Sequence, residues 1–195
     1  FRLRPWAESV ALARRHGVKI LASLDDPRVK DTLARELRST PDAWRGRSAE
    51  AWAAGADGIS LFNFHDLVRD GGAAVLRDLP DPARLATRPQ DVFVSWLGQV
   101  NSSAGNHPLE SFMKLPLLDG GRPKSLAAGG TERVPLVLWE DYAATKPAAL
   151  ELRLRVISLN ADEATPHLAV NGTAIDAARL TRDGEWLSVT ITPAE

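Results

Sequence analysis

Two short apolar runs of the sequence end in side chains that could act on a substrate. The first run ends at Asp25 and Asp26, whose carboxyl groups could give or take a proton. The second ends at Asn63, whose amide could hydrogen-bond a hydroxyl, with Phe64 and His65 beside it. Adjacent residues of a strand point to opposite faces, so only one of the two aspartates is expected to face a substrate. The alternative for this aspartate pair, which precedes a proline, is a structural role in a turn.

The two runs belong to a unit that occurs twice. Gly17 and Gly55, 38 residues apart, each follow a predicted helix end and precede a short apolar run. Superimposing Gly17 on Gly55 places Asp25 on Asn63. Two helix-then-strand units at this spacing predict consecutive βα repeats of a parallel sheet or barrel. In such architectures the chemistry lies where the strands end, so the repeat indicates a working face.

The first half of the chain predicts alternating helices and strands. A helix is expected to run from a first-turn proline to the first of the two glycines. Residues 18–24 are apolar and almost without alternation, which predicts a strand buried on both faces. Thr40 and Pro41 predict an N-cap and a first helical residue, and this second helix continues through Ala54. Residues 58–64 are the second predicted buried strand.

The second half of the chain predicts a small antiparallel β-structure. The helical period fades near residue 89, and the candidate strands beyond it are residues 92–97, 134–139, 150–159, 167–170 and 186–191. Leucine and valine alternate with charged residues in 150–156, which is the period of a sheet with one dry and one wet face. Asn171 and Gly172 predict a tight hairpin turn. We therefore predict a β-sandwich domain over residues 89–195, after a first domain of residues 1–88.

Composition and charge argue against several classes of function. The 195 residues include 24 basic and 25 acidic side chains, which are intermixed and give a formal net charge of −1. Nucleic-acid-binding surfaces and anionic-membrane-binding surfaces usually carry a clustered basic excess, so neither partner is expected. No apolar run reaches the length of a membrane span. The first residues are not expected to be a signal peptide, because no apolar stretch and cleavage site follow them. The absence of cysteine excludes disulfides and thiolate metal sites.

Several prominent residues are expected to be structural. Asp57 lies at the opposite end of its strand from Asn63 and is predicted to be a turn residue. Trp44 and Trp52 share one face of the predicted second helix, and packing is their expected role. Two arginines of the same helix, Arg45 and Arg47, are expected to be solvated surface. A buried core position is favoured over an exposed carbohydrate-binding strip for three tryptophans of predicted strands: Trp96, Trp139 and Trp186.

No metal or cofactor is predicted. His65 and Asp66 could form an acid/base pair or supply two metal ligands. Two ligands do not make a metal site, however, and no third one is near them in the sequence. A surface histidine in a loop is the alternative for His65.

Three segments give the chain a family resemblance. Residues 50–63, EAWAAGADGISLFN, resemble the last helix and strand of bacterial glycoside-hydrolase-like (β/α)8-barrel proteins. Residues 77–86, RDLPDPARLA, resemble the segment that comes next in those proteins, and residues 152–172 resemble their C-terminal β-sandwich. The resemblance implies an α/β plus all-β architecture: the last βα units of a TIM-type barrel followed by a small antiparallel β-sandwich.

The resemblance also implies a partner for this chain. A barrel of this type has eight strands, and the sequence supplies two. The other strands would come from a missing N-terminal barrel segment or from another chain. The sequence does not begin with Met, so we expect a processed chain or an excerpt of a longer one. A bacterial protein is expected, and its compartment stays open, with secretion or the periplasm compatible with the resemblance.

The function that the resemblance implies is the hydrolysis of glycosidic bonds in a carbohydrate substrate. Glycosidases use two carboxyl groups, one to protonate the leaving oxygen and one as nucleophile or base. Asp25 and Asp26 are the predicted catalytic residues, and they depart from the family's usual glutamate at this place. Asn63, Phe64 and His65 are the predicted substrate-binding residues. The alternative is a non-catalytic carbohydrate-binding or structural protein on the same fold.

Overall fold

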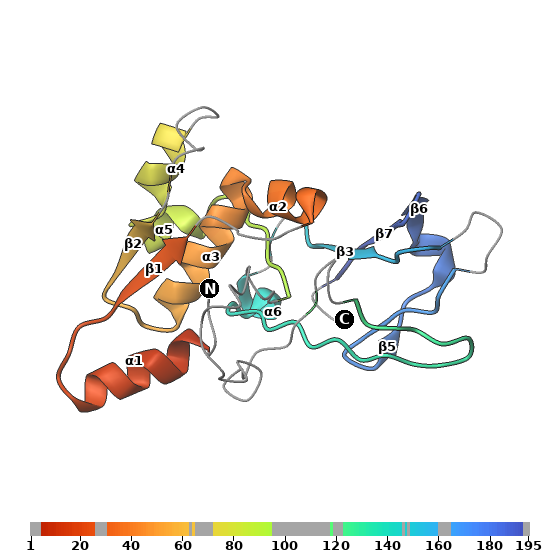
Figure 1. Cartoon of the computed structure of the whole chain (residues 1–195), viewed down its shortest axis with the longest axis horizontal. Helices are drawn as coiled ribbons and strands as arrows, with labels where there is room; N and C mark the ends of the chain where they lie inside the picture. Colours follow the sequence, from red (N-terminus) through yellow and green to blue (C-terminus); the bar gives the residue numbers. More distant parts are fainter. Residues whose placement is uncertain are drawn as a thin grey trace, which may run out of the picture. The chain divides into compact units, whose positions relative to one another are not determined.

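The computed structural model is mixed α/β, with one parallel and two antiparallel sheets in the part of the chain that it describes (Figure 1). It describes residues 5–25, 31–62, 64, 72–94, 118, 123–145, 147, 149–159 and 165–192. None of the helices in these ranges is long and apolar enough to cross a membrane. The chain forms two compact units, Phe1–Trp139 and Glu140–Glu195. The predicted domains of residues 1–88 and 89–195 stay a prediction.

The first unit contains the two helices that the sequence predicts. Helix α1 spans Trp6–Arg15, and helix α3 spans Pro41–Ala53. The hydroxyl of Thr40 accepts a hydrogen bond from the Ala43 N–H and so caps α3. Proline follows in the first turn, where its missing N–H costs no helical hydrogen bond. The predicted start of this helix is confirmed.

Both helices end in the same glycine-based stop. Gly17 after α1 and Gly55 after α3 have φ angles of 65° and 88°, in the left-handed region that favours glycine. Two hydrogen bonds close each stop: Gly17 N to Arg14 O and Val18 N to Ala13 O, then Gly55 N to Trp52 O and Ala56 N to Ala51 O. This pair of bonds is the Schellman motif. The sequence repeat is therefore also a repeat of backbone conformation.

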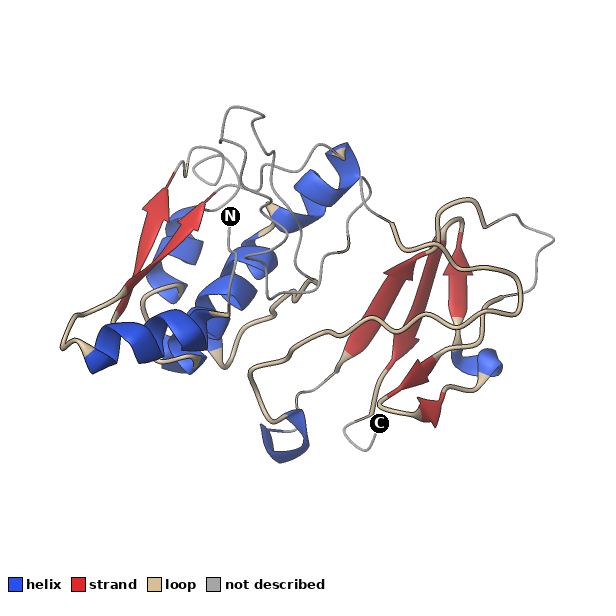
Figure 2. Cartoon of the chain, turned by 60° about the horizontal axis from the view of Figure 1, so that its bottom comes forward, coloured by secondary structure: helices blue, strands red, loops and turns tan. Residues whose placement is uncertain are grey.

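The strands that follow the two stops lie side by side and run parallel (Figure 2). Strand β1 spans Leu21–Asp25 and strand β2 spans Gly58–Phe62. The register places Asp25 beside Phe62, whereas alignment of the stop glycines in the sequence places Asp25 on Asn63. The difference arises because three residues separate the first glycine from β1 and two separate the second glycine from β2.

Only one face of the β1–β2 pair is covered by the residues that the structure describes. Ala22 and Leu24 are buried on the face toward the helices, whereas Leu21, on the other face, is 61% exposed. Ile59 and Leu61 of β2 pack in the same clusters as the buried residues of β1. The prediction that β1 is buried on both faces is wrong for the described residues, because the helical side chains that cover it lie on one side.

Asp57 ties the amino-terminal ends of the two strands together. Its carboxylate accepts a hydrogen bond from the Ile20 N–H at 2.8 Å, and its own N–H donates to the Ile20 carbonyl at 2.9 Å. The Arg14 guanidinium donates to the carbonyl of Gly55, two residues earlier, at 3.1 Å. These bonds confirm the structural role predicted for Asp57 and place it at the end of the sheet opposite Asp25.

Helix α3 also holds the segment beyond β2. This segment includes helix α4, Gly72–Asp78, and the short helix α5, Pro82–Leu85. The carbonyl of Leu79 accepts hydrogen bonds from Ser48 Oγ and Trp52 Nε1, each at 2.8 Å. Trp52 is half-buried and its indole nitrogen has a partner, and the packing role predicted for it stays a prediction.

A glycine in α3 lets an extended segment approach the helix closely. The Asp91 N–H donates to the carbonyl of Asp42 at 3.0 Å, which brings residues 91–94 against α3. A Cβ atom on Gly46 would collide with the carbonyl oxygen of Asp91. The close approach therefore requires glycine, although glycine is a poor helix former.

Helix α2, Thr32–Arg38, contacts the same extended segment. The guanidinium of Arg38 is buried and lies over the ring of Phe93, 4.9 Å from its centroid. Residues 92–94 are therefore extended chain and not the strand predicted for 92–97, whose other residues lie outside the described ranges.

The second unit contains an antiparallel sheet in the strand order β3–β7–β6 (Figure 2). Its elements are α6 Tyr142–Thr145, β3 Glu151–Arg155, β4 Ala169–Val170, β5 Thr173–Ala174, the 3-10 helix η3 Ala177–Arg179, β6 Thr181–Asp183 and β7 Trp186–Thr190. Asn171 and Gly172 join β4 to β5 with φ angles of 51° and 89°. The predicted hairpin turn is confirmed, as are strands within the predicted 150–159, 167–170 and 186–191.

The core of this unit lies on one face of the sheet, as the alternation of leucines predicts. Leu152 pairs with Val189 in the register, and Leu154 pairs with Leu187. Val189 is buried with Ile175 and a third residue, Ile191. An antiparallel sheet with one dry face is confirmed, and the finer assignment to a sandwich stays a prediction.

Two expectations for the β-structure are wrong. Residues 134–139 form no strand, although their apolar run predicts one. Trp186 does not join the core cluster, because the register pairs it with Arg155 on the polar face. The guanidinium of Arg153 lies 5.1 Å from the centroid of the Trp186 ring on that face. Trp96, predicted to be buried, lies outside the described residues.

The close approach at Gly46 predicts the effect of a substitution. We expect Gly46→Ala to lower the free energy of unfolding by about 1–3 kcal/mol, because the added methyl group displaces the Asp91 backbone. Thermal and urea unfolding monitored by circular dichroism measure the change. Ala53→Gly, at an exposed position of α3, is the matched control for intrinsic helix propensity. A Gly46→Ala variant as stable as the wild type would contradict the packing described.

The hydrogen bonds of Glu185, in the turn before β7, predict a lowered pKa for its carboxyl group. Hydrogen bonds, first from the Ser158 N–H and then from the Arg155 guanidinium, hold the pKa of the Glu185 carboxyl below its ordinary value. A carboxyl group with a lowered pKa in the folded state stabilises it above the ordinary pKa, and this contribution is lost as the pH falls through the lowered pKa. Carbon-detected NMR titration should give a lowered pKa for Glu185 that rises in Arg155→Met.

The control for this titration is Arg153→Met, on the same strand. Its guanidinium stacks on Trp186 and is not a cause of the Glu185 shift. We expect it to leave the Glu185 pKa unchanged. Equal Glu185 pKa values in the wild type and in Arg155→Met would refute the assigned cause.

Candidate functional site

The candidate site lies at the carboxyl ends of β1 and β2. Asp25 is the last residue of β1, and the register places Phe62, the last residue of β2, beside it. By strand alternation Asp25 shares the open face with Leu21 and Ser23, away from buried Ala22. A carboxyl group at the end of a parallel strand occupies the place where such folds position reactive groups.

Three of the predicted site residues cannot be placed. Asp26, Asn63 and His65 lie outside the residues that the structure describes. The structure therefore locates Asp25 and Phe64 of the five predicted residues, and the roles of all five stay predictions.

Phe64 packs inward more than its predicted role suggests. Its ring meets Trp44 edge-on, with centroids 4.9 Å apart and planes at 80°. It belongs to the partly buried side chains around the cluster that contains Leu24 and Val75. Phe62 is the more exposed of the two phenylalanines, at 55%, and it lies beside Asp25. An aromatic surface for a ligand is therefore offered by Phe62 as well as by Phe64.

Trp44 is the buried centre of this end of the unit. Its side chain is 1% exposed and packs with Leu24 of β1 and with Val75 and Leu79. The packing role predicted for it from helical spacing is confirmed. Because Trp44 touches Phe64 as well, one side chain of α3 supports both strand ends.

Arg47 makes two contacts that the sequence does not reveal, one with Trp44 and one with Asp25. Its guanidinium lies over the ring of Trp44, 4.0 Å from the centroid, and its Nη1 donates to the backbone carbonyl of Asp25 at 2.9 Å. The prediction that Arg47 is solvated surface is wrong, because it fills the space between α3 and the end of β1. The signal in the sequence is the three-residue spacing of Trp44 and Arg47, which places them on one helix face.

Arg45 is also drawn inward, which overturns its predicted solvated position. Its Nε lies 3.0 Å from a carboxylate oxygen of Asp78, and side-chain exposures are 14% and 5%. Arg45 also forms an ion pair with Asp42, and Arg88 forms a second ion pair with Asp78 at 3.8 Å. A buried carboxylate of this kind is tolerated because it is paired and hydrogen-bonded. These ion pairs join α4 to α3.

We call Asp25, Arg47, Trp44 and Phe64 the strand-end cluster. Each member contacts the next: a hydrogen bond joins Asp25 to Arg47, a cation–π contact joins Arg47 to Trp44, and an edge-on ring contact joins Trp44 to Phe64. The cluster holds one carboxyl group and aromatic surface at the ends of parallel strands. The carboxyl group can accept or donate a proton at a ligand, and the exposed Phe62 beside it can pack against an apolar ring face.

The described part of the chain contains no group of three or more His, Cys, Asp or Glu side chains that could hold a metal ion.

The burial of Trp44 predicts a large loss of stability when its ring is removed. We expect Trp44→Ala to lower the free energy of unfolding by about 3–5 kcal/mol, since the cavity lies between α3 and both strands. Urea unfolding monitored by circular dichroism measures it. Trp44→Phe should lose less, and Trp186→Ala, on the polar face of the other sheet, is the control. A loss for Trp44→Ala no larger than that for Trp186→Ala would be inconsistent with this core.

Comparison with known proteins adds no relative. No protein-family model matches the chain. Searches of curated proteins and of solved structures also give no match.

Proposed function

We propose that this chain supplies the last βα units of a glycoside-hydrolase-like (β/α)8 barrel, followed by a β-sandwich domain. In this proposal the complete protein hydrolyses a glycosidic bond of a poly- or oligosaccharide, and Asp25 or Asp26 is one of the two carboxyl groups required. The observation that carries the proposal is the place of Asp25: at the carboxyl end of a parallel strand, on the face away from the helices.

The open face of the strand pair differs in composition from the face toward the helices. By alternation the residues on it are Leu21, Ser23, Asp25, Gly58, Ser60 and Phe62. Three of these six are glycine or serine, whereas a parallel sheet with helices on both faces is rich in Val, Ile and Leu on both. A barrel has helices outside and an inner face that carries the active site at the carboxyl ends of the strands. Leu21, at the start of β1, would then contribute to the packed interior, and Phe62, at the carboxyl end of β2, would line the site.

The proposed roles of the other residues follow from their place at the carboxyl ends of β1 and β2. Phe62 and Phe64 offer aromatic surface to the apolar face of a sugar ring. Asn63 and His65 follow the end of β2 in the sequence, and they would hydrogen-bond the hydroxyl groups of the substrate. Hydrolysis by two carboxyl groups needs no cofactor, and the second carboxyl group would come from the remainder of the barrel.

The remainder of the barrel is the partner that the proposal requires. A parallel pair is stable where helices and further strands cover its faces and edges. An N-terminal segment or another chain would supply those strands. Intact-mass measurement of the purified complex under native and denaturing conditions identifies which of the two is present.

A non-catalytic carbohydrate-binding or structural protein on the same fold is the second candidate. The observation that favours it is the residue type: aspartate stands where the resembling family commonly has glutamate. The exposed Phe62 would serve binding equally well. Binding of oligosaccharides without release of reducing ends would select this candidate.

The catalytic proposal predicts a loss of activity on neutralising the carboxyl groups. We expect the double variant Asp25→Asn, Asp26→Asn of the complete protein to hydrolyse oligosaccharides about 10²–10⁴-fold more slowly, because a proton-transferring or nucleophilic group is lost. Reducing-end release from a panel of oligosaccharides measures the rate.

The matched control is Asp57→Asn at the other end of the strands. Asp57 bonds the backbone of Ile20, so this variant should lose stability and keep its activity below the unfolding temperature. Activity unchanged in the double variant would remove both aspartates from the mechanism.

A further inference from the structure

We propose that Arg47 is a positioning residue, which sets the direction of the chain at Asp25 and couples it to Phe64. The inference rests on the proposed function, because it gives Arg47 a role in orienting the carboxyl group that the function requires. It goes beyond that function because it states that a residue of α3, on the helical side of the sheet, orients a side chain on the open face.

The first step of the argument is the hydrogen bond at the end of β1. The Arg47 Nη1 donates to the carbonyl oxygen of Asp25 at 2.9 Å, and the donor is a cation. Hydrogen bonds from a charged donor are stronger than those between neutral groups. Because the carbonyl orientation is part of the backbone geometry at Asp25, this bond restrains the orientation of the same residue's Cα–Cβ vector.

The second step is the rigidity of Arg47 itself. Its guanidinium lies 4.0 Å from the centroid of Trp44, and Trp44 is 1% exposed. A cation–π contact with a buried ring restricts the rotamers of a long side chain. The arginine therefore acts as a spacer of defined length between α3 and β1.

The third step is the path to the second strand end. The Trp44 ring that carries Arg47 also meets the Phe64 ring, with centroids 4.9 Å apart. Movement of Trp44 would change both contacts, since interiors are close-packed. Arg47 and Trp44 therefore join Asp25 and Phe64, which lie after different strands, through a single helix.

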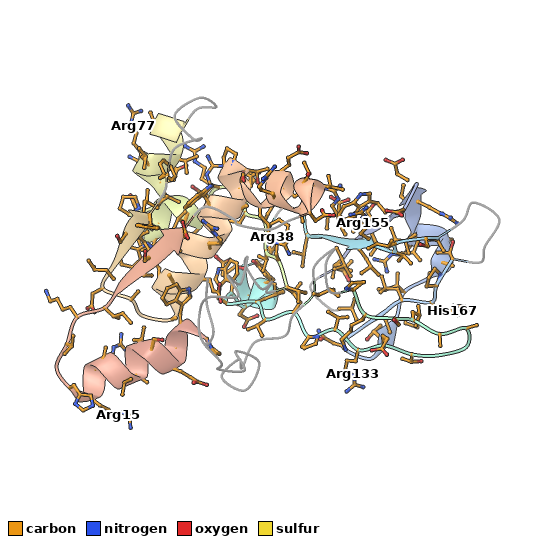
Figure 3. All side chains as sticks on the ribbon, in the orientation of Figure 1. Arg15, Arg38, Arg77, Arg133, Arg155 and His167 are labelled. Atoms are coloured by element: carbon orange, nitrogen blue, oxygen red, sulfur yellow. The ribbon has the colours of Figure 1, made fainter. Side chains whose placement is uncertain are left out.

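Hydrogen exchange of the complete protein tests the proposal without a substrate. We expect Arg47→Met, which keeps the stem and removes the donor, to accelerate exchange of the Asp25 amide about tenfold relative to the Ser23 amide, which points to the same edge of β1. The Asp25 carbonyl carbon resonance should move upfield, because the carbonyl loses a hydrogen bond. Arg47→Lys, which retains a cationic donor, should restore most of the protection. The control is Arg77→Met, whose side chain points away from α4 (Figure 3).

Two results would overturn the inference. One is equal acceleration at Ser23 and Asp25, which would show a general loss of stability. The other is unchanged exchange and an unchanged carbonyl resonance at Asp25. Neither depends on hydrolysis, so an inactive protein with local acceleration at Asp25 refutes the proposed function alone. In an active complete protein, Arg47→Met should lower kcat more than it raises KM, and Arg47→Lys should recover kcat.

Discussion

The packing of α3 onto one face of two parallel strands is the constraint on which the first unit depends. Trp44 fills the space beneath both strand ends, and Ser48 and Trp52 hold the chain that returns after β2. Gly46 lets a further segment lie against the same helix. With the helix fully occupied on its inner side, the opposite face of the strands is left to carry Asp25 and Phe62. The candidate site is thus a product of what the helix covers and what it leaves uncovered.

Charge is used in the two units in different ways. In the first unit Arg45 and Arg47 turn inward, one to a buried carboxylate and one to a backbone carbonyl, so that cations become part of the interior. In the second unit Arg153 stacks on Trp186 and Arg155 meets Glu185 on the polar side of the sheet. Arg47 restrains backbone geometry at the end of β1, which is what a site built on strand ends needs.

The elements that the sequence predicts correctly are those decided by local chemistry. The stops at Gly17 and Gly55, the cap at Thr40 and the turn at Asn171 each depend on residues within a few positions. The inward arginines, the single-sided burial of β1 and the polar-face position of Trp186 depend on contacts between distant segments. Hydrophobic periodicity could not reveal them, since it reports which residues avoid water and not which neighbours they meet. For the same reason Asp25 could be placed at a strand end from sequence, while its bond to Arg47 could not.

The two stops have identical hydrogen bonding, yet the loops that follow them differ by one residue. The length of this loop therefore determines which side chains of β1 face the helix. Side chains alternate along a strand. If the loop between Gly17 and β1 were one residue shorter, Asp25 would occupy the position that Leu24 now has in the apolar cluster. The carboxyl group would then have to lose its charge or break the packing. An insertion or deletion at this connection would thus transfer the working surface from one side of the sheet to the other, with every helix unchanged.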